Sequence, residues 1–155
     1  MRPGTRLALD IGKVRIGVAR SDIDGIMALP VKTIHRSNDG QDFQEVLELV
    51  QEYDPIEVIV GLPRHMSGHE GGSAAMARAY GTKLARRIHP IEVRLVDERL
   101  TTVSAHAQLH ESGRSTRQHR QVVDQVAATV ILEHALEIER RLGEAAGTKL
   151  VVKGS

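Results

Sequence analysis

One short run constrains the fold of this 155-residue chain more than any other. Ile56 to Leu62 is almost wholly apolar and is followed at once by Pro63, which cannot donate to a sheet. Strands of this kind are buried on both faces, and in sheets that contain them helices cover both faces. The run therefore predicts a strand of a parallel sheet inside an α/β domain.

Three further apolar, β-branched runs open the chain. They are Leu7 to Leu9, Val14 to Ala19 and Ile26 to Ile34, and the breaks between them are short and rich in Gly and Asp. Breaks of this length and composition are typical of hairpins. We therefore expect three antiparallel strands before the buried one.

Helical patterns alternate with strand patterns in the rest of the chain. Gln41 to Tyr53 has apolar residues at three- and four-residue spacing, as an amphipathic helix requires. The later elements are expected to be a helix from about Ser73 to Ile88, a strand from Ile91 to Val96, a short helix from Thr101 or Thr102 to about Glu111, and the longest helix from Val122 to Leu142. Strands reached through helices run parallel to a neighbour by right-handed crossovers.

This order predicts an α/β fold with a five-stranded mixed sheet flanked by helices, which is the order of elements in the ribonuclease H-like fold. Residues 1–142 then form a single domain, a common size for one core. Residues 111–121 are polar and basic without apolar periodicity, so we expect a mobile surface loop. The tail, residues 143–155, is ambiguous: Leu150 to Val152 either pair with a strand or fray.

Composition excludes several classes of function. Without cysteine there is no disulfide, thiol nucleophile or Cys-based zinc site. No signal peptide or run of about 18 apolar residues occurs, so we expect a soluble, cytoplasmic protein with no membrane partner. Only three aromatic residues are present, which argues against a surface for stacking bases.

Charge is distributed unevenly, although the net charge is only +1. The segment from Asp39 to Glu57 holds seven acids and no Lys or Arg, whereas nine basic residues face four acids from Arg78 to Arg120. A basic segment of this kind can bind a nucleic acid through its phosphates, or it can be ordinary solvated helix surface. The sequence alone leaves both interpretations open.

Acids occur at three points that the predicted topology can bring together. Asp10 ends the first strand beside Gly12 and Gly17, while Asp97 and Glu98 end another strand. Asp124 falls in the first turn of the predicted long helix among apolar neighbours, so partial burial is expected. Each acid also has an ordinary structural explanation. Asp10 can be a turn residue, the Asp97–Glu98 pair can be neutralised by Arg94 or Arg99, and Asp124 can complement the helix dipole.

The convergence of these acids is the stronger observation. Ligands of open α/β sheets bind at the carboxyl ends of parallel strands, where two strand ends and one helix start can meet. Clustered carboxylates repel one another unless a cation neutralises them. The pattern therefore predicts a site for one or two Mg²⁺ or Mn²⁺ ions, which polarise a phosphate and activate water.

Four segments, in this order, closely resemble the YqgF/RuvX family. They are Leu7 to Asp22, Val60 to Pro63 with Met66 and Gly68, Val96 to Thr102, and Val123 to Ala128. The resemblance implies a ribonuclease H-like fold, a cytoplasmic location and a nuclease that matures the 5′ end of pre-16S rRNA in ribosome biogenesis. In older usage the family is described as Holliday junction resolvases.

Carried over by motif, the resemblance implies that Asp10, Glu98 and Asp124 are the catalytic acids and metal ligands. A strand-end acid at the centre of a sheet is held rigidly, so Asp10 is the best candidate to bridge two ions. The role of Asp97 stays open. Candidates for contact with substrate phosphates are the basic residues Lys13, Arg15, Arg99, Arg114, Arg117 and Arg120.

Three alternatives remain at this stage. The first hairpin also resembles that of actin- and hexokinase-type nucleotide-binding proteins, but that architecture usually needs two such domains. A module that binds RNA or a transcription complex without catalysis would keep the basic surface and tolerate the loss of acids. A resolvase would cut a DNA junction, for which a homodimer is expected, whereas a monomer suffices for structured RNA.

Overall fold

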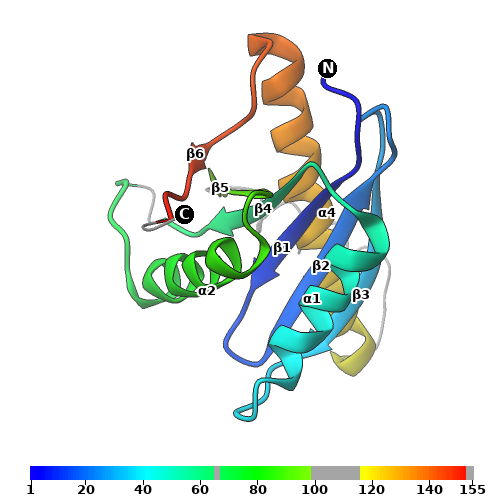
Figure 1. The fold of residues 1–155 in the computed structure, drawn as a ribbon. Coiled ribbons are helices and arrows are strands. Elements are labelled where there is room, and N and C mark those ends of the chain that lie inside the picture. Colours follow the sequence, from blue (N-terminus) through cyan, green and yellow to red (C-terminus); the bar gives the residue numbers. More distant parts are fainter. Residues whose placement is uncertain (65–66, 99–115, 153–155) are drawn as a thin grey trace.

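A computed structural model describes residues 1–64, 67–98 and 116–152 (Figure 1). In this part of the chain six strands form one sheet in the order β3-β2-β1-β4-β5-β6. The strands are β1 (Arg6–Ile11), β2 (Arg15–Ser21), β3 (Ala28–His35), β4 (Glu57–Leu62), β5 (Glu92–Asp97) and β6 (Thr148–Lys149), and the helices are α1 (Gln41–Tyr53), α2 (Gly72–Ile88) and α4 (Thr116–Leu142). The prediction of a mixed sheet is confirmed, because β4 runs parallel to β1 and β5 while β2, β3 and β6 run antiparallel to their neighbours.

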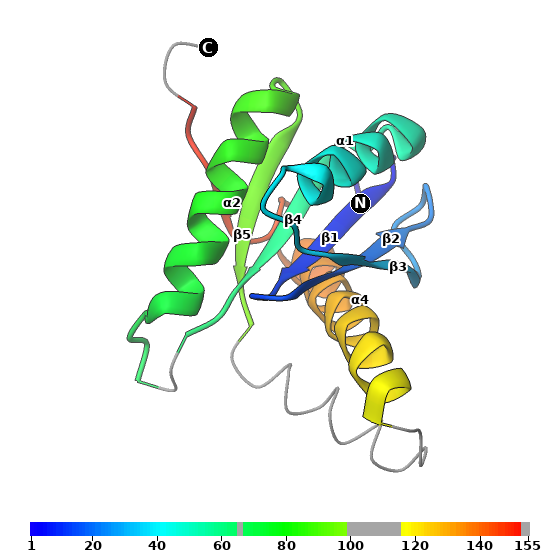
Figure 2. The same ribbon diagram turned by 90° about the horizontal axis from the view of Figure 1, so that it is seen from below.

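The sheet separates two layers of helices (Figures 1 and 2). Helices α1 and α2 cover one face, and the long helix α4 covers the other. In β1, Leu7 and Leu9 belong to the core beneath α1 and α2, whereas Ala8 belongs to the core beneath α4. This alternation follows from the two-residue period of a strand, and every residue of β4 is buried, as its apolar sequence predicts.

The sequence prediction was wrong about the number of strands. It expected five, and the sixth is β6, in which Thr148 pairs with Leu95 and Lys149 with Arg94. The two residues of β6 are exposed, so they carry no apolar signal. Ala146, just before β6, is buried in the core beneath α4, which ties this part of the tail to the sheet.

The start of the longest helix was also predicted incorrectly. Helix α4 begins at Thr116, so the expected loop over residues 111–121 is helical from residue 116 onward. Figure 2 shows the opening turns of α4 extending past the edge of the sheet. Turns in this position do not need the apolar stripe by which a core-facing helix is recognised. The expected short helix, from Thr101 or Thr102 to about Glu111, lies outside the described residues.

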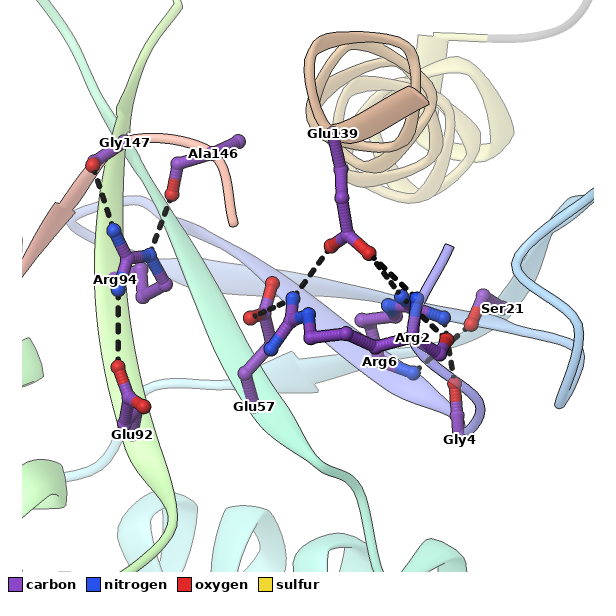
Figure 3. Close-up of polar contacts among 10 residues, drawn as sticks. All are labelled: Arg2, Gly4, Arg6, Ser21, Glu57, Glu92, Arg94, Glu139, Ala146 and Gly147. Atoms are coloured by element: carbon purple, nitrogen blue, oxygen red, sulfur yellow. Dashed lines mark hydrogen bonds and ion pairs between the residues drawn. The ribbon is translucent and has the colours of Figure 1, made fainter. Parts of the chain in front are cut away.

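A buried ionic cluster fastens the N-terminal segment to α4 at the amino end of β1 (Figure 3). Arg2 contacts Glu57 at 2.6 Å and Glu139 at 2.5 Å, while the fully buried Arg6 donates to Glu139 at 2.8 Å. Burial opposes ionisation of Glu139, but hydrogen bonds from Arg2 and the charges of Arg6 and Arg2 lower its pKa to about 2. The cluster therefore depends on an ionised Glu139 and lies at the end of β1 opposite Asp10.

Among the helices of the described residues, none combines the length and the apolar character that crossing a bilayer requires.

Candidate active site

Three acids from three elements lie on the α4 face of the sheet at its carboxyl edge. Asp10 in β1 lies two residues after Ala8 of the α4-side core, while its neighbour Ile11 belongs to the opposite core. Glu98 directly follows β5, and its backbone N–H donates to the carbonyl of Leu62 at 3.2 Å. The third acid, Asp124, belongs to α4 itself.

Two glycines on the same face make room for these acids. A Cβ atom at Gly61 in β4 would collide with Oε2 of Glu98 and with Cδ1 of Ile131. A Cβ atom at Gly17 in β2 would collide with the backbone carbonyl of Asp124. Gly17 thus allows α4 to pack against the sheet, and Gly61 makes room for the Glu98 carboxylate.

The acids are coupled electrostatically. Burial, and then the charge of Asp124, raise the pKa of Asp10 to about 7. Burial, and then the charges of Asp10 and Asp97, raise the pKa of Glu98 to about 8. Each shift has a like charge among its causes, so Asp10 is coupled electrostatically to both Asp124 and Glu98. Carboxylates in such a setting favour protonation or a nearby cation.

Asp124 is held by an arginine from the first hairpin. Nε of Arg15 in β2 donates to Oδ2 of Asp124 at 2.6 Å, and the Asp124 side chain is 17% exposed, in agreement with the predicted partial burial. The prediction that Asp124 lies in the first helical turn is wrong, because α4 begins at Thr116. A dipole interaction at the helix start therefore does not explain this acid.

Asp97 faces the other side of the sheet from the three acids, although its charge contributes to the raised pKa of Glu98. It follows Leu95, a member of the core beneath α1 and α2, so the period of β5 directs it toward that face. There Arg64 approaches Asp97 at 3.7 Å and also contacts Glu70 at 3.2 Å. Arg94, which the sequence suggested as a partner for Asp97, instead contacts Glu92 at 3.0 Å and donates to two backbone carbonyls before β6 (Figure 3).

The donor set matches a divalent cation in its chemistry. Carboxylate oxygens are the ligands that Mg²⁺ and Mn²⁺ take, and the like-charge coupling of Asp10 with Glu98 and Asp124 is what a cation relieves. Within the described residues, no three Asp, Glu or His side chains lie close enough to hold one ion as they stand. Binding an ion therefore requires these side chains to draw together, and one oxygen of Asp124 is already engaged by Arg15.

The predicted substrate residues are distributed unevenly over the structure. Lys13 is exposed in the turn between β1 and β2, two residues before β2, while Arg15 forms an ion pair with Asp124. Arg117 and Arg120 fall on the opening turns of α4, and Arg99 and Arg114 lie outside the described residues. Gly61 and Arg64 were not predicted as site residues, although the sequence Gly61-Leu62-Pro63 at the end of β4 lies at this position.

A comparison with protein families finds one that covers most of the chain. Residues 4–138 match the model of the family described as "RuvX: Holliday junction resolvase". A protein of Streptomyces avermitilis named "Putative pre-16S rRNA nuclease" is 50% identical over 147 residues, which are 95% of this chain and 94% of that protein. A protein of Thermobifida fusca with the same name is 53% identical and covers 91% of this chain and 92% of its own length.

Solved structures share the fold at much lower identity. Thermus thermophilus RuvC in complex with a Holliday junction substrate aligns with a TM-score of 0.55 and 15% identity, over 95% of this chain and 99% of that one. A second Thermus thermophilus RuvC structure aligns with a TM-score of 0.56, also at 15% identity. These alignments confirm the ribonuclease H-like fold predicted from the order of elements.

Proposed function

The chain belongs to the RuvX family, and from this premise we propose that it is a metal-dependent nuclease that hydrolyses phosphodiester bonds during 5′-end maturation of pre-16S rRNA. The observation that carries the proposal is the arrangement of Asp10, Glu98 and Asp124. They come from three elements and share one face at the carboxyl edge of the sheet, where the charge of Asp124 helps to raise the pKa of Asp10 and the charge of Asp10 helps to raise that of Glu98.

In this proposal the three acids hold one or two Mg²⁺ or Mn²⁺ ions. Bound there, a divalent ion would polarise the scissile phosphate and lower the pKa of the attacking water. Asp10 lies in β1, between β2 and β4, and pairs with Gly17 of β2, so it is the acid that would be shared by two ions if two are bound. Glu98 and Asp124 complete the ligand set from either side.

Basic residues of the first hairpin complement the acids. Arg15 orients Asp124 through its Nε and has further N–H groups with which to contact a phosphate. Lys13 is exposed in the adjoining turn and adds a second positive charge at the same edge. Arg99, Arg114, Arg117 and Arg120 are proposed to contact the flanking backbone of the nucleic acid.

Precursor rRNA is the substrate we favour because it is named in relatives about 50% identical to this chain over nearly its whole length. The cytoplasm is then the place of action. A DNA four-way junction is the second candidate, favoured by the family's description and by the fold shared with RuvC. Symmetric cutting of a junction would call for a homodimer, whereas a monomer suffices for RNA.

The test is cleavage of two end-labelled substrates side by side, a pre-16S rRNA fragment and a DNA four-way junction. Each is incubated with Mg²⁺, Mn²⁺ or EDTA, using wild-type protein and Asp10→Asn. The proposal expects metal-dependent cleavage of the RNA that Asp10→Asn abolishes while binding persists. Cleavage of the junction alone would select the second candidate. RNA binding without any cleavage would favour a non-catalytic binding module.

A further inference from the structure

Arg36, which follows the end of β3, makes contacts that tie the first hairpin to the helical layer. Its Nη1 donates to the carbonyl of Gly12 at 2.9 Å, and its backbone N–H donates to the carbonyl of Val14 at 2.7 Å. Its Nε donates to Asp42 of α1 at 3.0 Å, and its guanidinium lies 5.1 Å from the centre of the Tyr80 ring in α2. One side chain thus connects the β1–β2 turn with two helices.

The turn that Arg36 holds joins two residues of the candidate active site. It connects Asp10, near the end of β1, to Arg15, the first residue of β2 and the partner of Asp124. Within the turn the N–H of Gly12 donates to the carbonyl of Arg15 at 2.8 Å, and a Cβ atom at Gly12 would lie 2.7 Å from that oxygen. The turn is therefore tight, and a fixed Gly12 carbonyl limits where both neighbouring residues can lie.

The other end of this connection is itself well anchored. Asp42 is buried, and Ser37 links its backbone to its side chain by accepting from the Asp42 N–H at 3.1 Å and donating to Oδ1 at 3.3 Å. The charge of Arg36 is paired with this buried carboxylate: its Nε donates to Asp42, and its Nη1 donates to Gly12. The Arg36 side chain therefore connects the β1–β2 turn to α1 and has its charge neutralised within the protein.

We propose that Arg36 is a positioning residue that fixes the β1–β2 turn, and through it Asp10 and Arg15, against the α1–α2 layer. The inference deepens the proposed function and rests on it, because it assigns a residue that sets up the metal-binding edge without touching substrate. A planar guanidinium can donate to Asp42 and to Gly12 at the same time, whereas the single ammonium group of a lysine cannot, so lysine does not replace Arg36. Arg36→Lys keeps a charge beside Asp42 and gives up the bond to Gly12.

The test compares wild type, Arg36→Lys and Arg36→Met, with Tyr80→Phe as the control. The control keeps the aromatic ring under Arg36 and removes only a hydroxyl that has no hydrogen-bond partner among the described residues. Two readouts use folded protein without nucleic acid: Mn²⁺ affinity by calorimetry and hydrogen exchange of the Gly12 amide. A third readout is kcat and KM for the labelled RNA.

For Arg36→Lys we expect Mn²⁺ affinity to fall about tenfold, a size seen when groups that orient metal ligands are removed. We also expect faster exchange at the Gly12 amide and a lower kcat, with KM changed by less than about twofold. Arg36→Met should show the same changes more strongly, and Tyr80→Phe none of them. If Arg36→Met does not fold, Arg36→Lys decides the question.

Two results would overturn the inference. Unchanged Gly12 exchange in both variants would show that Arg36 does not fix the turn, whether or not the protein is a nuclease. A raised KM at constant kcat would show that Arg36 contacts substrate instead. If wild-type protein neither binds Mn²⁺ nor cleaves RNA, the proposed function fails. Hydrogen exchange at the Gly12 amide still tests independently whether Arg36 fixes the β1–β2 turn.

Discussion

Replacing Asp10 by asparagine is expected to stabilise the metal-free protein. Burial and the charge of Asp124 raise the pKa of Asp10 from 3.8 to about 7, so the folded protein opposes its ionisation. An acid whose pKa is raised on folding leaves the free energy of unfolding unchanged at pH values below its unfolded pKa, where it is protonated in both states. As pH rises the acid lowers the free energy of unfolding, and the effect is complete above the folded pKa. Since one pKa unit corresponds to about 1.4 kcal/mol, the full cost is about 4 kcal/mol.

Asparagine keeps the shape of the side chain and removes the charge, although its amide also loses hydration there. We therefore expect Asp10→Asn to raise the free energy of unfolding by about 2–4 kcal/mol at about pH 8, and by less than half of that at about pH 5. The assay is urea unfolding followed by circular dichroism in EDTA at both pH values. The variant should also lower the pKa of Glu98, because the charge of Asp10 contributes to its shift.

Divalent cations should reverse the order of stability. An ion that binds only the folded wild type adds stability in proportion to the logarithm of its concentration over the dissociation constant, and Asp10→Asn should gain little. Asp22→Asn is the matched control, because Asp22 is partly exposed and accepts hydrogen bonds from the N–H groups of Met27 and Ile26, which lower its pKa. This control should lose stability at about pH 8 and respond to Mg²⁺ like wild type. An Asp10→Asn protein no more stable than wild type at about pH 8 in EDTA would refute the reasoning.

Three further outcomes are expected. Glu139→Gln should lower the free energy of unfolding by about 3 kcal/mol at neutral pH, because buried Arg6 loses its charged partner. In urea unfolding this difference should vanish as pH falls from about 4.5 toward 2, and a constant difference would contradict the lowered pKa of Glu139. Gly61→Ala should weaken Mn²⁺ binding in calorimetry because the new methyl group displaces the Glu98 carboxylate, and unchanged affinity would remove Glu98 from the ligand set. Tyr80→Phe should leave the free energy of unfolding unchanged or raise it by about 1 kcal/mol in urea unfolding, because the hydroxyl is buried without a hydrogen-bond partner in the described structure. A clear loss of stability would contradict this and show that the hydroxyl has a partner.

Local patterns predicted the elements whose apolar residues face the core. The bounds of α1, Gln41–Tyr53, agree with the prediction, and β4 is the expected strand buried on both faces. The positions of Asp10 and Glu98 could be predicted for a related reason, because a strand-end position follows from the end of an apolar run. Asp10 and Glu98 therefore lie on one face, as the strand period and the parallel order of the strands require.

Contacts between distant parts of the chain were beyond the reach of such patterns. The Arg15–Asp124 pair joins residues 109 positions apart, and the contact of Arg2 with Glu139 spans 137. Side chains of this kind look like ordinary surface charges until the fold brings them together. The first turns of α4 were missed for a different reason, because they extend past the sheet and show no apolar period.

The most direct test of the central claim is a crystal structure of the protein soaked with Mn²⁺, with the ion located by its anomalous scattering. We expect at least one Mn²⁺ ion within coordination distance of the carboxylates of Asp10, Glu98 and Asp124, and no such ion in Asp10→Asn crystals soaked in the same way. An ion bound elsewhere, or three acids that stay apart at saturating Mn²⁺, would contradict the account.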